Sequence, residues 1–63
     1  MSIKRNEFLK HLNDHNCFLS KYASKHDIFQ NEITKKKTTI PRHPQLDKRL
    51  CELICKQLEI AKP

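Results

Sequence analysis

Apolar residues recur at helical spacing near the start of the chain. Between Ile3 and His15, the side chains of Phe8, Leu9 and Leu12 fall on one stripe of a helical wheel, and polar residues occupy the rest. This pattern predicts an amphipathic helix over residues 3–15. Asn16 follows the last turn, where many helices end on a residue with left-handed backbone.

Three shorter segments have the length and composition of strands. Cys17–Tyr22 and Asp27–Gln30 are rich in aromatic and branched residues, and Lys36–Ile40 is a third candidate that Pro41 closes at a position tolerated in strands. The polar segment 31–35 fits a hairpin loop between the last two. Together the three segments predict an antiparallel meander.

The strongest periodic pattern lies near the C-terminus. Pro44 suits the first turn of a helix. Apolar residues then recur at intervals of four, three, one and four: Leu46, Leu50, Leu53, Ile54 and Leu58. The resulting α-β-β-β-α order predicts an α+β fold, with two helices on one face of a three-stranded antiparallel sheet and the other face open. We expect residues 1–63 to form a single domain.

Size and charge restrict what such a domain can do. The 63 residues include 13 Lys and Arg against 7 Asp and Glu, which gives a net charge of +6. A chain this short has a small core, so it is expected to act through its surface rather than through a deep pocket. No apolar run approaches the length of a membrane span or of a signal peptide, so we expect a cytoplasmic protein that does not bind membranes.

Cysteine and glycine usage adds two further expectations. The three cysteines are an odd number and no secretion signal accompanies them, so reduced thiols are expected. The chain contains no glycine. Turns that need a positive φ must therefore use Asn, Asp or Ser, or be replaced by longer loops.

Several segments together resemble the HicA family of toxins, and they span nearly the whole chain: Lys4–Leu12, Asn16–Cys17, Lys25–Phe29, Ile40–His43 and Leu50–Leu58. The resemblance implies a fold like that of double-stranded-RNA-binding domains, ribonuclease activity on mRNA, and neutralisation by a HicB antitoxin. The catalytic histidine of the family opens its second strand, which by motif is His26. The proline-x-histidine motif after the third strand corresponds to Pro41-Arg42-His43.

The chemistry of RNA cleavage suits this assignment. RNA supplies its own nucleophile, so cleavage needs a base for the 2′-hydroxyl, an acid for the leaving 5′-oxygen, and positive charge beside the transition state. An imidazole with an ordinary pKa near 6.5 can take both proton-transfer roles at neutral pH. Beside His26, Lys25 would supply charge and Ser24 a hydrogen bond. No metal or other cofactor is expected.

Spacing alone leaves other interpretations of the two histidines open. His26 could be a loop histidine that merely begins a strand. His43, next to Pro44, could cap the second helix, or it could assist catalysis or contact the antitoxin. For His43 the residues do not decide between these roles.

A basic rim is a further candidate feature, and it consists of Lys21, Lys25, Lys35, Lys36, Lys37 and Arg42. We assign Lys21, Lys35, Lys36 and Lys37 to the RNA backbone, and Arg42 and His43 to auxiliary or phosphate-binding roles. The alternative is that these lysines keep an edge strand soluble. Phe18, Tyr22 or Phe29 could stack on unpaired bases, although rings in so small a protein are usually core.

Metal binding is a competing hypothesis. His11 and His15 lie four apart on the first predicted helix, and Cys51 and Cys55 lie four apart on the second, so packed helices could bring the four together around zinc. The alternative is packed thiols and surface imidazoles, which we favour. A cysteine nucleophile is disfavoured because no cysteine is near His26 in sequence.

The sequence thus favours a metal-independent endoribonuclease toxin that cleaves mRNA with His26 and forms a hetero-oligomeric complex with a HicB-like antitoxin. The alternative is a module of the same fold without catalytic activity, which would bind only RNA or only the antitoxin.

Overall fold

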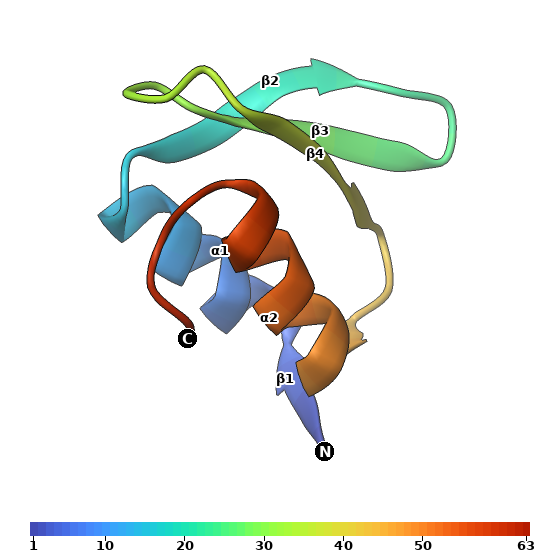
Figure 1. Ribbon diagram of the computed structural model, residues 1–63. Helices are drawn as coiled ribbons and strands as arrows, with labels where there is room; N and C mark the ends of the chain where they lie inside the picture. The colour runs from blue at the N-terminus through green and yellow to red at the C-terminus, as the bar shows by residue number, and fades with distance from the viewer.

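Two helices cover one face of a three-stranded antiparallel sheet in the computed structural model, which describes all 63 residues (Figure 1). The helices are α1 (Arg5–Asp14) and α2 (Lys48–Gln57). The sheet has the order β2-β3-β4, with β2 at Cys17–Tyr22, β3 at His26–Asn31 and β4 at Lys37–Pro41. The predicted α+β fold, with its α-β-β-β-α order and both helices on one sheet face, is confirmed. Neither helix has the length and apolar character needed to cross a membrane.

A second, two-stranded ribbon was not predicted. β1 (Ser2–Lys4) pairs antiparallel with β5 (Gln45–Asp47), so that Ile3 lies opposite Leu46. Each strand leads directly into a helix, and the ribbon therefore holds the starts of α1 and α2 together. The expected helix boundaries at Ile3 and Pro44 are wrong, since these residues belong to or precede the ribbon. Three-residue strands carry no recognisable periodicity, and only their pairing across the chain defines them.

The two faces of the sheet differ in exposure. Along β3, Asp27, Phe29 and Asn31 are buried toward the helices. The residues that alternate with them, His26, Ile28 and Gln30, lie on the opposite face and are more exposed. We call the face opposite the helices the open face. Because residues paired across antiparallel strands share a face, it also carries four neighbours of Ile28 and Gln30: Phe18, Lys21, Lys37 and Thr39. A bulge between Leu19 and Lys21 shifts the alternation of β2.

The core lies between the helices and the inner sheet face. It consists of ten buried residues: Phe8, Leu12, Cys17, Phe29, Ile40, Leu46, Cys51, Ile54, Cys55 and Leu58. Leu53 was expected to join this stripe but is 51% exposed, because the stripe of α2 passes through Cys51, Ile54 and Cys55 instead. The expectation of packed thiols is confirmed, since all three cysteines are free and buried.

Three residues have a positive φ: Asn16 (65°), Lys35 (67°) and Glu59 (59°). Asn16 follows α1 as predicted. Lys35 and Glu59 are not residue types expected there, and local hydrogen bonds accompany this backbone at both positions. The amide of Lys35 donates to the carbonyl of Asn31 at 2.8 Å. After α2, the amide of Glu59 donates to the carbonyl of Lys56 at 3.1 Å and that of Ile60 to the carbonyl of Cys55 at 2.9 Å. This pair of hydrogen bonds closes the helix as a Schellman motif, which requires left-handed backbone at Glu59.

Candidate functional site

His26 is the first residue of β3, and its exposed side chain lies on the open face. It ends the turn that joins β2 to β3, and a hydrogen bond of 2.9 Å from the amide of Ala23 to the carbonyl of His26 closes that turn. Ser24 and Lys25 occupy the turn and are exposed. The structure therefore brings three of the predicted site residues together at one end of the sheet.

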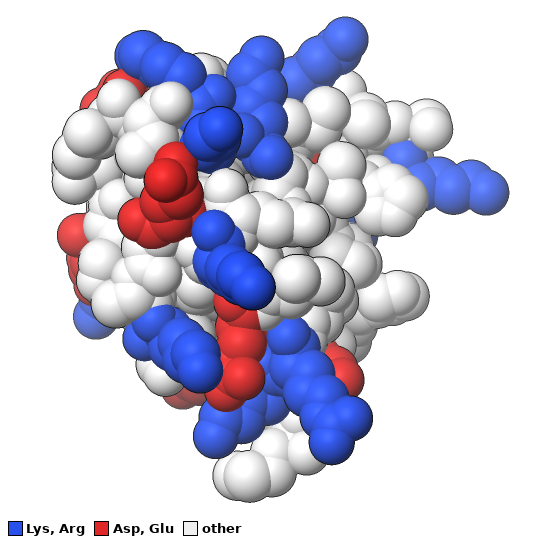
Figure 2. Space-filling model, viewed as in Figure 1, with Lys and Arg blue, Asp and Glu red and all other residues white.

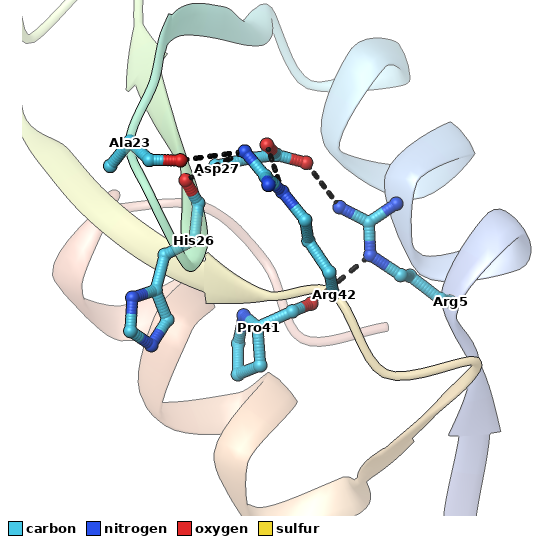
Figure 3. Close-up of polar contacts among 6 residues, drawn as sticks. All are labelled: Arg5, Ala23, His26, Asp27, Pro41 and Arg42. Carbon is cyan, nitrogen blue, oxygen red and sulfur yellow. Dashed lines mark hydrogen bonds and ion pairs between the residues drawn. The ribbon is translucent and has the colours of Figure 1, made fainter.

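Asp27, directly after His26, is the centre of a polar network (Figure 3). Its carboxylate is buried, with 8% of the residue exposed. The Nε of Arg42 donates to Oδ1 of Asp27 at 2.9 Å, and Nη2 of Arg5 donates to Oδ2 at 2.5 Å. Arg5 also donates from Nε to the carbonyl of Pro41 at 3.1 Å. A single carboxylate thus connects the first residue of α1 with β3 and with the segment after β4.

Two opposing effects act on the pKa of Asp27. Burial disfavours the carboxylate and raises the pKa. Hydrogen bonds and positive charge from Arg42 and Arg5 favour the carboxylate, and together they hold the pKa below its ordinary value. Asp27 is therefore ionised at neutral pH and neutralises part of the charge of its two partners.

Arg42 holds the turn as well as the carboxylate. Its Nη2 donates to the carbonyl of Ala23 at 2.8 Å and to that of His26 at 3.3 Å. In Figure 3 the imidazole of His26 points away from the guanidinium groups of Arg42 and Arg5. Arg42, which we expected to bind phosphate, is thus bonded within the protein on the other side of β3 from the imidazole, although its side chain is 42% exposed.

The predicted basic rim is divided along the sheet. Lys21 lies opposite Ile28 on the open face, while Lys35 and Lys36 are in the β3–β4 loop and Lys37 lies opposite Gln30. The lysine run therefore lies at the end of β3 remote from His26, about 16 Å away at the usual rise per strand residue. In Figure 2 the basic side chains around the sheet, at the top, have few acidic neighbours, whereas both signs mix over the helices.

The remaining candidates have distinct surroundings. His43 is exposed and precedes Pro44, and it does not cap α2, because the N-cap residue of that helix is Asp47. Phe18 is 41% exposed on the open face and Tyr22 is 72% exposed, so both rings are accessible. Phe29 is a core residue.

The two histidines and the two cysteines of the alternative zinc site form separate pairs. Cys51 and Cys55 are in the core, where burial raises both thiol pKa values, that of Cys55 to about 11. Nε2 of His11 is 2.8 Å from the carbonyl of Ala61, and Nδ1 of His15 is 2.8 Å from the carbonyl of His11. Both imidazoles are thereby hydrogen-bonded to backbone, and the structure contains no cluster of three potential metal ligands.

One shallow polar depression of about 390 Å³ lies at the start of α1, and none of its lining residues is a predicted catalytic or RNA-binding residue: Lys4, Arg5, Asn6, Glu7, Pro44 and Gln45. The candidate site is therefore an open surface, as the size of the chain led us to expect.

Sequence reasoning missed Arg5 and Asp27 as parts of the site. The only local indication was an acidic residue at an inward position of a predicted strand, since buried carboxylates require partners. The partners of Asp27 are separated from it by 22 and 15 residues, so no local pattern identifies them.

The fold and site define a small basic α+β domain with an exposed histidine on an uncovered sheet face. Residues 5–60 match the family described as "HicA toxin of bacterial toxin-antitoxin". Because the match covers most of the chain, the protein belongs to the HicA toxin family and is a toxin of a toxin–antitoxin system. Searches of curated proteins and of solved structures gave no match.

Proposed function

We propose that this HicA toxin is a metal-independent endoribonuclease that cleaves mRNA with His26 as its proton-transfer group. The observation that carries the proposal is the position of His26: an exposed imidazole at the start of β3, on the open face, without a hydrogen bond to the rest of the protein. A free imidazole on an accessible surface can reach a phosphodiester and exchange protons with it.

The reaction follows from the chemistry of RNA. His26 accepts the proton of the 2′-hydroxyl as the 2′-oxygen attacks the adjacent phosphorus, and the bond from phosphorus to the 5′-oxygen breaks. The leaving oxygen takes a proton, for which His43 is the candidate donor. The products are a 2′,3′-cyclic phosphate and a 5′-hydroxyl. No step needs a redox partner or a Lewis acid.

Cations near His26 support binding of the phosphate. Lys25 is adjacent in the exposed turn, and Lys21 lies two pairs along the sheet on the open face. Together with Ser24 they offer charge and hydrogen bonds to the phosphate and its developing negative charge. Lys35, Lys36 and Lys37, at the far end of the sheet, would contact phosphates several nucleotides away.

The proposed partner is a HicB-like antitoxin that forms a hetero-oligomeric complex with this chain in the cytoplasm, where mRNA is found. Covering the open face around His26 would block both RNA and the imidazole. A partner with acidic residues opposite the lysines of the sheet would associate rapidly through charge attraction. The family membership supports a partner of the antitoxin kind.

The test is the substitution His26→Ala, compared with His43→Ala, which removes the candidate donor of the second proton. Only backbone atoms of His26 bond within the protein, so the variant should fold. We expect cleavage of end-labelled RNA to fall by about 10²–10⁴-fold, the usual contribution of a general acid or base. Cleavage by the parent should persist in EDTA and leave cyclic phosphate ends. A comparable loss in His43→Ala identifies a second proton-transfer group.

Unchanged cleavage by a folded His26→Ala protein would refute the mechanism. If the parent binds RNA or an antitoxin but never cleaves RNA, the alternative of a non-catalytic binding module is correct. Loss of cleavage in EDTA that zinc restores would instead favour metal chemistry at the histidines of α1.

A further inference from the structure

The turn that carries His26 is held by a side chain rather than by glycine. The chain contains no glycine, and residues 23–25 close the turn with a single backbone hydrogen bond, from the amide of Ala23 to the carbonyl of His26. We propose that Arg42 is a positioning residue for His26, fixing the turn through the carbonyls of Ala23 and His26 while Asp27 fixes Arg42. This proposal deepens the proposed function and rests on it.

The hydrogen bonds of Arg42 suit this role. Its Nε is committed to Asp27, and its Nη2 reaches both carbonyls at the two ends of the turn, at 2.8 and 3.3 Å. A guanidinium is planar and its donors have fixed directions, so the bond to Asp27 also determines where Nη2 points. The carbonyl of His26 is thus bonded both by the turn itself and by Arg42.

Asp27 is itself anchored to the helical layer. Its second oxygen accepts from Arg5, the first residue of α1, and Arg5 also donates to the carbonyl of Pro41. Pro41 lies opposite His26 in the register of β3 and β4. The backbone on both sides of His26 is therefore fixed relative to the core, through one buried carboxylate and two guanidinium groups.

The geometry distinguishes positioning from phosphate binding. The imidazole of His26 points away from the guanidinium of Arg42 (Figure 3). A phosphate bound at the imidazole would therefore lie away from Nε and Nη2 of Arg42, the atoms that bond Asp27 and the two carbonyls. A displacement of about 1 Å in a catalytic group can cost about 100-fold in rate. Loss of Arg42 should accordingly lower kcat, whereas loss of a phosphate contact should raise KM.

The first experiment needs no activity. In the free protein, hydrogen exchange is measured at the amide of Ala23 and, as an internal control, at the amide of Asn31, which closes the other hairpin by donating to Lys36 at 2.9 Å. We expect Arg42→Ala to accelerate exchange at Ala23 by about tenfold or more, with little change at Asn31. Equal acceleration at both amides would indicate general destabilisation and would overturn the proposal.

The second experiment compares Arg42→Ala with Lys37→Ala in cleavage of a defined RNA. For Arg42→Ala we expect a fall in kcat of about 10- to 100-fold, with KM and its salt dependence nearly unchanged. Lys37→Ala, which removes a charge from the open face, should raise KM and flatten its salt dependence at similar kcat. If Arg42→Ala behaves as Lys37→Ala is expected to, Arg42 binds phosphate and the proposal is wrong.

Arg42→Lys keeps the proposal testable if Arg42→Ala fails to fold. An ammonium group preserves the charge near Asp27 but has no fork to bond the carboxylate and two carbonyls at once. The lysine variant should therefore show faster exchange at Ala23 and a lower kcat than the parent protein. Exchange and kcat equal to those of the parent would contradict the proposal. If the parent cleaves no RNA, the proposed function fails, whereas the exchange experiment still decides whether Arg42 holds the turn.

Discussion

At the scale of single residues, Glu59 adopts a conformation that glycine adopts more easily. Its φ of 59° costs an L-residue about 1–2 kcal/mol, and its carboxylate lies at the negative end of the α2 dipole. We expect Glu59→Gly to raise the free energy of unfolding by about 0.5–1 kcal/mol, after subtraction of the greater entropy of glycine in the unfolded chain.

Lys56→Gly is the matched control for Glu59→Gly. Lys56 is in the last turn of α2, where glycine should cost about 0.5–1 kcal/mol. Urea unfolding followed by circular dichroism measures both changes. If Glu59→Gly lowers the free energy of unfolding as Lys56→Gly is expected to do, the left-handed backbone of Glu59 carries no strain.

Asp27 makes the free energy of unfolding depend on pH. Its folded-state pKa lies below the ordinary value of 3.8, so the ionised carboxylate favours the native state. This contribution is fully present above the ordinary value and is lost as the pH falls through the folded-state pKa. Urea midpoints should therefore decrease on acidification below about pH 4, and less so in Asp27→Asn. Equal pH dependence of the two proteins would assign the effect to other carboxylates.

At the scale of elements, α2 has adjacent residues with opposite surroundings. Ile54 is 1% exposed and Leu53 is 51% exposed. We expect Ile54→Ala to cost about 2–5 kcal/mol, comparable to the entire stability of a domain of this size, and Leu53→Ala to change stability by less than about 0.5 kcal/mol. Chemical denaturation measures the stability of both variants. A large loss of stability in Leu53→Ala would mean that Leu53 belongs to the buried face of α2.

The elements that could be predicted are those with a local pattern. The stripe of Phe8 and Leu12 defines α1, and branched and aromatic runs define β2 and β3, because side-chain periodicity depends on neighbours in sequence. Leu53 was assigned to the core because three- and four-residue spacings outline a stripe wider than the one that is buried. β1 and β5 could not be found, since only pairing with a distant partner makes them strands.

In the candidate site, too, the sequence located residues that are neighbours in the chain but not contacts between distant segments. Ser24, Lys25 and His26 are consecutive, so the sequence located them together, and the resemblance to the family predicts a catalytic role for His26. The network of Arg5, Asp27 and Arg42 joins three distant segments and depends on the fold. Arg42 was predicted to have an auxiliary or phosphate-binding role, but its hydrogen bonds within the protein could not be predicted from sequence.

At the scale of the whole molecule, charge follows the two layers. Asp27 and Glu32 are the only acidic residues between β2 and β4, and Asp27 is bonded to two arginines. The other five acidic residues belong to α1, to β5, to α2 and to the segment after α2: Glu7, Asp14, Asp47, Glu52 and Glu59. The sheet layer is thus the more basic one, which is consistent with the proposed binding of RNA.

The ribbon of β1 and β5 also affects the order in which the molecule folds. It pairs the two segments that flank the long stretch of chain from Arg5 to Pro44. In addition, the backbone amide of Lys48 donates to the carbonyl of Met1 at 3.0 Å. Contacts between distant segments form after local hairpins, because closing a long loop costs entropy first. The ribbon should therefore be absent from the folding transition state, and Ile3→Ala should speed unfolding while leaving the folding rate nearly unchanged in stopped-flow measurements. A slower folding rate in that variant would place the pairing of the N-terminal strand in the nucleus instead.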